Sequence, residues 1–197
     1  MAAKTASLPD DLREILAQLE ASDREAHTLL HDLNEEQLNW RPDERSWSIA
    51  QCLDHLNETN RIYLAPILDA IGKARKAGSV RRGPVRPGFL GRWFVSWMEP
   101  PPKRKVPAPG KLVPALRKGR AELLEDWRRT QAELSAVLHE AAGVDLNATR
   151  FVNPFLSVIR FSVGAGFQVI AAHERRHLWQ AEQVRRRGEF PQSPRSS

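Results

Sequence analysis

Apolar residues recur every three or four positions in four long segments of the chain, and polar or charged residues fill the positions between them. This period places the apolar side chains of each segment on one face of an α-helix. The expected helices, in chain order, run from about Pro9 to Leu33, from Ser46 or Trp47 to about residues 72–78, from about Pro114 to Ala142, and from about Ser162 to Arg187. Because no strong strand signal accompanies them, the pattern predicts an all-α fold, a four-helix bundle.

Residues 79–112 differ from these segments, because they combine many prolines and glycines with aromatic and basic residues. The prolines and glycines exclude one long regular helix. The apolar residues between Phe89 and Met98 are too many for a flexible linker. We therefore expect a long ordered loop, with a short extra helix inside it, that packs against the four long helices.

The chain has 197 residues, which is enough for one domain with a hydrophobic core. We expect this domain to span residues 1–188, with Ser7 as the cap of its first helix. Residues 189–197 are rich in proline, serine and glutamine, so they are expected to form a disordered tail.

The compartment expected from the sequence is the cytoplasm. No basic segment followed by an apolar core opens the chain, and no stretch of about 18 apolar residues could span a membrane, so we expect no membrane partner. Cys52 is the single cysteine, which excludes an internal disulfide and fits a reducing compartment.

The net charge is +6, from 30 Lys and Arg against 24 Asp and Glu. Much of the excess lies in residues 73–118 and 185–187. Such a balance is compatible with nucleic-acid binding, yet the chain carries no recognised nucleic-acid motif. We favour a solvated basic surface and do not expect a nucleic-acid partner.

Two histidines interrupt the apolar face of the fourth expected helix. His173 and His177 are four residues apart, so their rings project from one side of the helix. A buried imidazole needs partners for its ring nitrogens, and two of them on one apolar stripe are best satisfied by a shared metal ion. The alternative is a pair of core histidines that hydrogen-bond to neighbouring groups.

The best candidate for a third metal ligand is His55. It lies at the edge of the apolar stripe of the second expected helix, where it can point to the interior, either as a ligand or as an inter-helix hydrogen-bonding residue. His27 and His31 have polar neighbours and His139 lies away from its helix's stripe, so these three are expected on the surface. Three histidines would leave metal positions open for water or substrate.

The sequence from His173 to His177 also matches the zinc-protease pattern H-E-x-x-H, in which Glu174 would be the general base. We reject this interpretation, because only 20 residues follow His177 and no strand-containing catalytic domain is predicted. Glu174 lies about 100° around the helix from His173. We expect it to pair with a basic residue on the helix surface.

Three stretches carry a resemblance to a known family: residues 36–42, residues 47–56, which end in Asp54-His55-Leu56, and residues 173–180, which begin His-Glu-Arg-Arg-His. Together they resemble the DinB-like superfamily over nearly the whole chain. The resemblance implies a four-helix bundle with a three-histidine metal site, and it maps His55, His173 and His177 onto the family's ligands. The segment 79–112 is a departure from the family pattern.

The resemblance also implies a function. The family is similar to metal-dependent thiol transferases that use bacillithiol or mycothiol, and to maleylpyruvate isomerase. We therefore expect a divalent ion, zinc or nickel first and manganese or iron after them. The expected partners are a small electrophilic substrate, a low-molecular-weight thiol and a second copy of the chain. The alternatives are a hydrolase, and a non-catalytic helical bundle that binds a metal or an anion.

Overall fold

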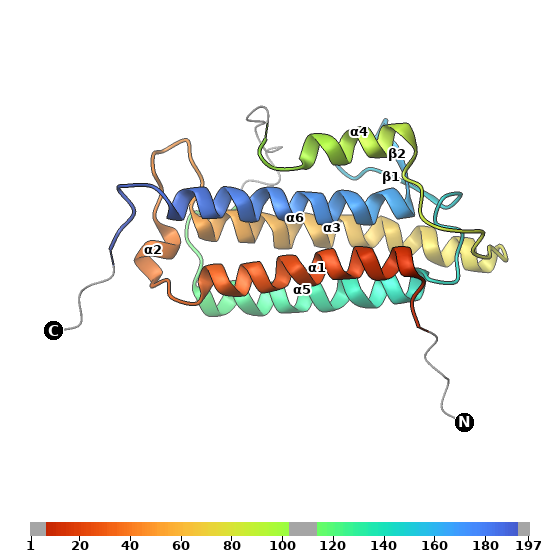
Figure 1. Cartoon of the computed structure of the whole chain (residues 1–197), viewed down its shortest axis with the longest axis horizontal. Coiled ribbons are helices and arrows are strands. Elements are labelled where there is room, and N and C mark those ends of the chain that lie inside the picture. Colours follow the sequence, from red (N-terminus) through yellow and green to blue (C-terminus); the bar gives the residue numbers. More distant parts are fainter. Residues whose placement is uncertain (1–6, 103–113, 193–197) are drawn as a thin grey trace, which may run out of the picture.

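Within residues 7–102 and 114–192, which the computed structural model describes, six helices and one two-stranded sheet form the molecule. Four of the helices are long and lie side by side (Figure 1). They are α1 (Asp10–Leu30), α3 (Ile49–Lys76), α5 (Arg120–Ala141) and α6 (Val163–Arg185). The chain is therefore mostly helical, as the sequence predicted.

Each long helix contacts two of the others. Both α5 and α6 contact α1, and both also contact α3. The helices α3 and α5 run in the same direction, opposite to α1 and α6 (Figure 1). The helix α4 (Gly88–Met98), which lies between α3 and α5 in the chain, runs in the direction opposite to α3 (Figure 1).

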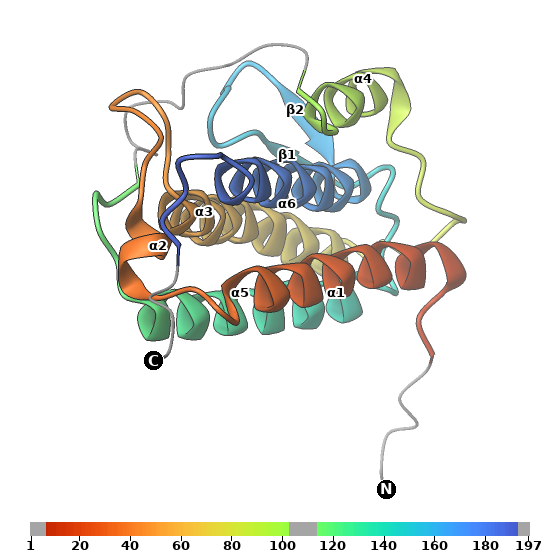
Figure 2. The ribbon, with the colours of Figure 1, turned by 60° about the vertical axis from the view of Figure 1, so that its left-hand side comes forward.

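A third layer covers α6 on the side away from α1 and α5 (Figure 2). It consists of the helix α4 (Gly88–Met98) and an antiparallel hairpin of β1 (Arg150–Val152) and β2 (Arg160–Ser162). The helix α4 is the short extra helix expected within residues 79–112. The last part of that segment, residues 103–112, lies outside the described part of the chain. The hairpin was not predicted, because strands of three residues are too short to show an alternating pattern.

The two strands are held in place by the side chains that they bury. Phe151 and Phe161 are paired across the hairpin and both point into the core. Phe161 also meets Phe94 of α4, with ring centroids 5.1 Å apart. The hairpin thus joins α4 to the long helices through one aromatic cluster.

Side-chain caps position the two helices that carry the histidine pair and His55. Ser48 and Gln51 form a reciprocal capping box at the start of α3, with both hydrogen bonds 3.1 Å long. At the start of α6, Ser162 accepts a hydrogen bond of 3.2 Å from the amide of Ala165. By contrast, α1 begins after Pro9 with no side-chain cap, so the predicted Ser7 cap is wrong.

Two predicted boundaries are corrected by the structure. The first helix ends at Leu30, and a short helix α2 (Glu35–Asn39) follows it. The helix α5 begins at Arg120 rather than near Pro114, because the amides of Ala115 and Lys118 donate to side-chain oxygens of Asp54 and Asn39 instead of continuing a helix.

The predicted disordered tail is corrected at its start. Phe190 is buried and packs edge-on against Trp40, with ring centroids 5.6 Å apart. The backbone carbonyl of Pro191 accepts a hydrogen bond of 2.8 Å from the Gln37 side chain. Residues 193–197 lie outside the described residues.

The buried apolar side chains form two clusters, one toward each end of the long helices. Buried polar side chains lie among them, and they include all three histidines singled out from the sequence. Other members of this buried polar group are Ser22, Asn57, Thr59, Asn60, Thr130 and Glu174, and the histidines are His55, His173 and His177. Among the described residues, no helix combines the length and the low polarity that crossing a membrane requires.

Two helical glycines should respond in opposite ways to alanine. Gly72 in α3 has nothing within 4 Å of the position of an added Cβ, so Gly72→Ala is expected to stabilise the protein by about 0.5–1 kcal/mol. At Gly166 in α6 that atom would lie 2.7 Å from the Phe151 ring. We expect Gly166→Ala to destabilise by about 1–3 kcal/mol, because the core must shift. Urea denaturation of both variants measures their free energies of unfolding. Equal changes in the two variants would contradict the prediction.

Candidate metal centre

The three histidines proposed as metal ligands lie together in the structure. His55 projects from the second turn of α3, and His173 and His177 project from successive turns of α6. The Nε2 atoms of His55 and His173 are 3.4 Å apart. One ring nitrogen from each of the three residues lies within 4.8 Å of the others. His55 therefore points to the interior beside the α6 pair.

The local sequence explains why the three rings meet. The spacing of four residues puts His173 above His177 on one face of α6, and their ring centroids are 4.6 Å apart. The helix α3 packs against α6 along its length. The capping box of Ser48 and Gln51 sets the start of α3, and His55 follows two turns later, opposite the α6 pair.

All three imidazoles are largely removed from water. Their exposed fractions are 4% for His55, 9% for His173 and 8% for His177. Burial lowers the pKa of His173 and of His177 well below the ordinary value of 6.5, and the neighbouring charges of the other histidines and of Arg176 lower it further. Both rings are thus neutral near pH 7, which is the form that binds metals.

Two nitrogens of the cluster lack a partner. The Nδ1 atoms of His173 and His177 are buried without a hydrogen-bond partner among the described residues. A buried ring nitrogen without a partner loses the hydrogen bonds it made to water, which costs about 1–3 kcal/mol. His173 and His177 therefore each carry one buried nitrogen whose burial is unfavourable.

The donor set fits a divalent metal ion. Two nitrogens bound at about 2.1 Å to a tetrahedral zinc ion are about 3.4 Å apart. The separation of the Nε2 atoms of His55 and His173 has this value, 3.4 Å. Neutral imidazoles also suit nickel, copper and iron, so the residues present can hold such an ion without specifying which one.

Trp47 forms one wall of the histidine cluster. Its ring stacks on His177 at a centroid distance of 5.6 Å and an interplanar angle of 26°. It also meets His55 at 4.8 Å. It is only partly buried, and it lies against the ligand rings.

The end of α4 is attached to α6 beside the cluster. Arg175 donates to the Glu99 carboxylate at 3.0 Å, and Arg176 donates to the backbone carbonyl of Trp97 at 3.1 Å. The Arg176 guanidinium also lies 5.8 Å from the centre of the Trp97 ring. Because Arg176 is close enough to lower the pKa of both α6 histidines, a fixed positive charge borders the site.

Glu174 is the residue that the sequence analysis placed wrongly. It is fully buried rather than paired on the helix surface. Its Oε1 accepts hydrogen bonds of 2.8 Å from Asn60 in α3 and 2.7 Å from Gln131 in α5. Burial raises the pKa of Glu174 to about 7, and these hydrogen bonds oppose that shift. The signal that could have revealed it is Asn60, a polar residue on the buried face of α3.

The position of Glu174 also bears on the zinc-protease pattern. In that pattern the glutamate acts on water beside the metal. Here the Glu174 carboxylate is engaged by Asn60 and Gln131. The geometry therefore agrees with rejection of the protease interpretation.

The remaining histidines, together with Cys52 and Gln180, lie outside the proposed set of metal ligands. His27, His31 and His139 are exposed. Cys52 is fully buried, and burial raises the pKa of its thiol, so it behaves as a small apolar residue rather than as a reactive thiol. Gln180 is partly buried, and its side chain interacts with His177, as its position one turn later allows.

Comparison with known proteins identifies the family. The model of the DinB superfamily matches residues 18–181, which include all three histidines. The chain therefore belongs to the DinB superfamily. No protein of curated function and no solved structure matches it significantly. The resemblance inferred from the sequence is thus confirmed at the level of the family.

Proposed function

We propose that the four long helices form a DinB-type four-helix bundle that binds one divalent metal ion through His55, His173 and His177. The observation that carries this proposal is the convergence of three buried imidazoles, two of which are already spaced as they would be on one tetrahedral ion.

We further propose that this site serves an enzyme that transfers a thiol to a small electrophile, with hydrolysis as the competing reaction. A metal held by three protein ligands retains open positions, where it lowers the pKa of a bound thiol or water. Arg176 would hold an anionic group such as a thiolate near the cluster. The backbone carbonyl and the ring of Trp97 keep its guanidinium in position. Trp47 would exclude water from the faces of His55 and His177.

The test of metal binding uses the native protein. Elemental analysis after purification without added metal is expected to find close to one divalent ion per chain. The His55→Ala, His173→Ala double variant is expected to contain none. An absence of metal from the wild-type protein, combined with no change in thermal stability on addition of zinc or nickel, would contradict the proposal.

The test of catalysis compares two reactions. Metal-free protein reloaded with zinc, nickel or manganese is assayed for conjugation of a thiol to a generic electrophile and for hydrolysis of a simple ester. We expect conjugation with at least one metal and its loss in His173→Ala. Activity that is unchanged in His173→Ala would show that the reaction does not use this site. Metal binding without activity would favour the non-catalytic alternative.

A further inference from the structure

The outer layer of the molecule, formed by α4 and the β1–β2 hairpin, exposes apolar side chains on a helix that is already packed on its other side. Gly91 and Phe94 face α6, whereas Phe89 and Trp93 face outward with exposed fractions of 80% and 54%. The residues Phe89, Arg92, Trp93 and Ser96 share this outward face, because they are spaced by three and four positions and all are exposed.

The hairpin continues the exposed apolar surface. Leu156 and Val158 lie in the turn between β1 and β2, and Val158 is 92% exposed. The hairpin lies next to α4 on the same side of α6 (Figure 2). Large apolar side chains that are exposed together mark an interaction site more often than isolated ones do.

The charged side chains of this outer layer are all positive. No acidic residue occurs between Asp69 and Glu99 or between Asp145 and Glu174, which are the two stretches that contain α4 and the hairpin. Five exposed arginines of these stretches have no ion pair with an acidic residue among those that the structure describes, whereas Arg81 nearby is paired with Asp11. The five are Arg82, Arg86, Arg92, Arg150 and Arg160.

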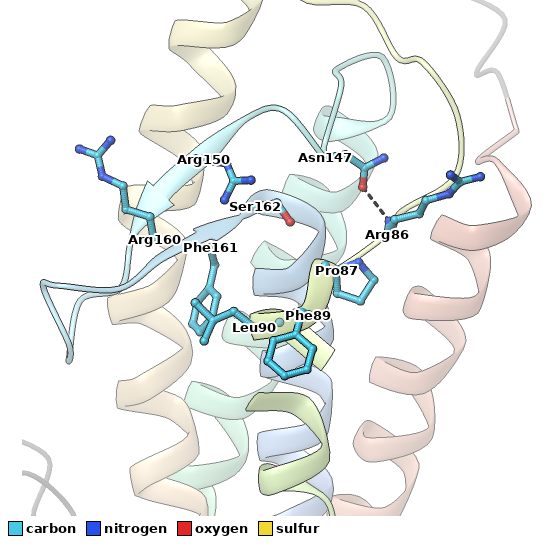
Figure 3. Close-up of a pocket in the computed structure, with 11 residues that line it drawn as sticks. Arg86, Pro87, Phe89, Leu90, Asn147, Arg150, Arg160, Phe161 and Ser162 are labelled. Carbon is cyan, nitrogen blue, oxygen red and sulfur yellow. Dashed lines mark hydrogen bonds between the residues drawn. The ribbon is translucent and has the colours of Figure 1, made fainter. Parts of the chain in front are cut away.

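Three of these arginines surround a small pocket of about 180 Å³ between the start of α4 and the hairpin (Figure 3). Arg150 lies next to Ser162, and Arg160 and Arg86 stand on either side of it and extend outward. The pocket is also lined by Gly88 and Phe89 in the first turn of α4, where free amides favour an anion. Phosphate groups match this combination of arginines and helix start.

We propose that the outer layer binds the surface of a membrane that contains anionic phospholipids. In this arrangement the arginines contact lipid phosphates, and Phe89, Leu90 and Trp93 enter the interface between headgroups and acyl chains. A basic helix with aromatic and aliphatic residues on its free face has the composition of such interfacial segments. The sequence predicted no membrane partner because nothing spans a bilayer, but peripheral binding does not require a spanning segment.

Two other occupants fit this surface less well. A second copy of the chain would bring two sets of unpaired arginines together in a symmetric contact, which is repulsive. A nucleic acid would use the arginines and aromatic rings, yet Leu90 and Val158 offer no ring on which a base can stack. A lipid surface uses all of these side chains.

The experiment measures cosedimentation of the full chain with vesicles of phosphatidylcholine, alone or mixed with phosphatidylglycerol. We expect binding to the mixed vesicles only, and a decrease when salt is raised. The variant Arg86→Ala, Arg150→Ala, Arg160→Ala is expected to reduce the partition coefficient about 100-fold, and Phe89→Ser, Trp93→Ser about 10-fold or more. Thermal unfolding of both variants checks that they fold.

The matched control removes the same charge elsewhere. Arg24, Arg45 and Arg187 are exposed outside this layer, so their joint replacement by alanine should change binding by only a few fold. No binding by the wild-type chain, or an equal loss in the control, would overturn the proposal. Binding to single-stranded DNA that the first triple variant abolishes, without binding to vesicles, would assign the surface to nucleic acid instead.

Discussion

His173→Ala is expected to weaken zinc binding by about two to three orders of magnitude, since four-ligand zinc sites bind with about 10–16 kcal/mol, or about 2.5–4 kcal/mol for each ligand. His173 lies close to both other members of the proposed set, because its Nε2 is 3.4 Å from that of His55 and its ring centroid is 4.6 Å from that of His177. Competition with a chelator of known affinity measures the loss. His139→Ala, on the exposed face of α5, is the control and should change nothing.

The same site gives a stability signature. Zinc at about 100 times its Kd should raise the free energy of unfolding of the wild-type protein by about 2.7 kcal/mol and leave His173→Ala unchanged. For metal-free protein, His173→Leu should be more stable than the wild type by about 1 kcal/mol, because leucine removes a buried nitrogen without a partner. A metal-free His173→Leu protein that is clearly less stable would indicate that the histidines are satisfied core residues.

Glu174→Gln is expected to stabilise the protein by about 3 kcal/mol at pH 8, because the folded state holds this carboxylate in a site that favours its neutral form. The magnitude follows from a pKa raised from 4.5 to about 7. Glutamine has the same shape, and its oxygen can accept the hydrogen bonds that Asn60 and Gln131 donate. Urea denaturation of metal-free wild type and variant measures the difference.

The gain from Glu174→Gln should depend on pH in a defined direction. A raised pKa means that the folded state binds a proton more tightly than the unfolded state does. The penalty of the wild-type carboxylate is therefore full above pH 7, declines as pH falls from 7 to 4.5, and is absent below 4.5. The lowered pKa of His173 and of His177 has the opposite effect, because stability is lost below pH 6.5 as the unfolded histidines bind protons.

The free energy of unfolding is measured against pH for the wild type and for Glu174→Gln. Because both proteins contain the same histidines, the difference between the two profiles gives the contribution of Glu174 alone. Glu174→Ala is the companion variant. It leaves the side-chain donors of Asn60 and Gln131 without an acceptor, so it should destabilise the protein by about 1–3 kcal/mol at pH 5. A difference between wild type and Glu174→Gln that stays constant from pH 5 to 8 would show that the carboxylate does not titrate in this range.

His173 and Glu174 are neighbours in the sequence and have separate roles in the structure. His173 faces His55, whereas Glu174 faces Asn60 and Gln131. Both are buried because α6 is covered by α1, α3 and α4, so little of its circumference reaches water. Helices covered on most sides carry polar residues inside only where those residues find partners or bind a ligand.

Much of the fold was predictable because it depends on local periodicity. The stripes of apolar residues identified the four long helices, and the aromatic residues between Phe89 and Met98 identified α4. Helix ends were less predictable, as α5 shows, because Asp54 and Asn39 compete for the amides of residues 115–118 from elsewhere in the chain. The hairpin depends on Phe151 meeting Phe161 and Phe94, and no local pattern of three residues encodes that contact.

By itself the sequence determined that His173 and His177 share one helix face, because a spacing of four residues and the geometry of the α-helix decide it locally. It also placed His55 at the edge of an apolar stripe, as the best candidate for a third ligand, and carried the family resemblance that implied the same set. Only the tertiary structure decided that the His55 ring meets this pair, that Trp47 covers it, and that Glu174 is buried. Those facts depend on which helices surround α6 and how closely they pack, and no spacing within one helix contains that information.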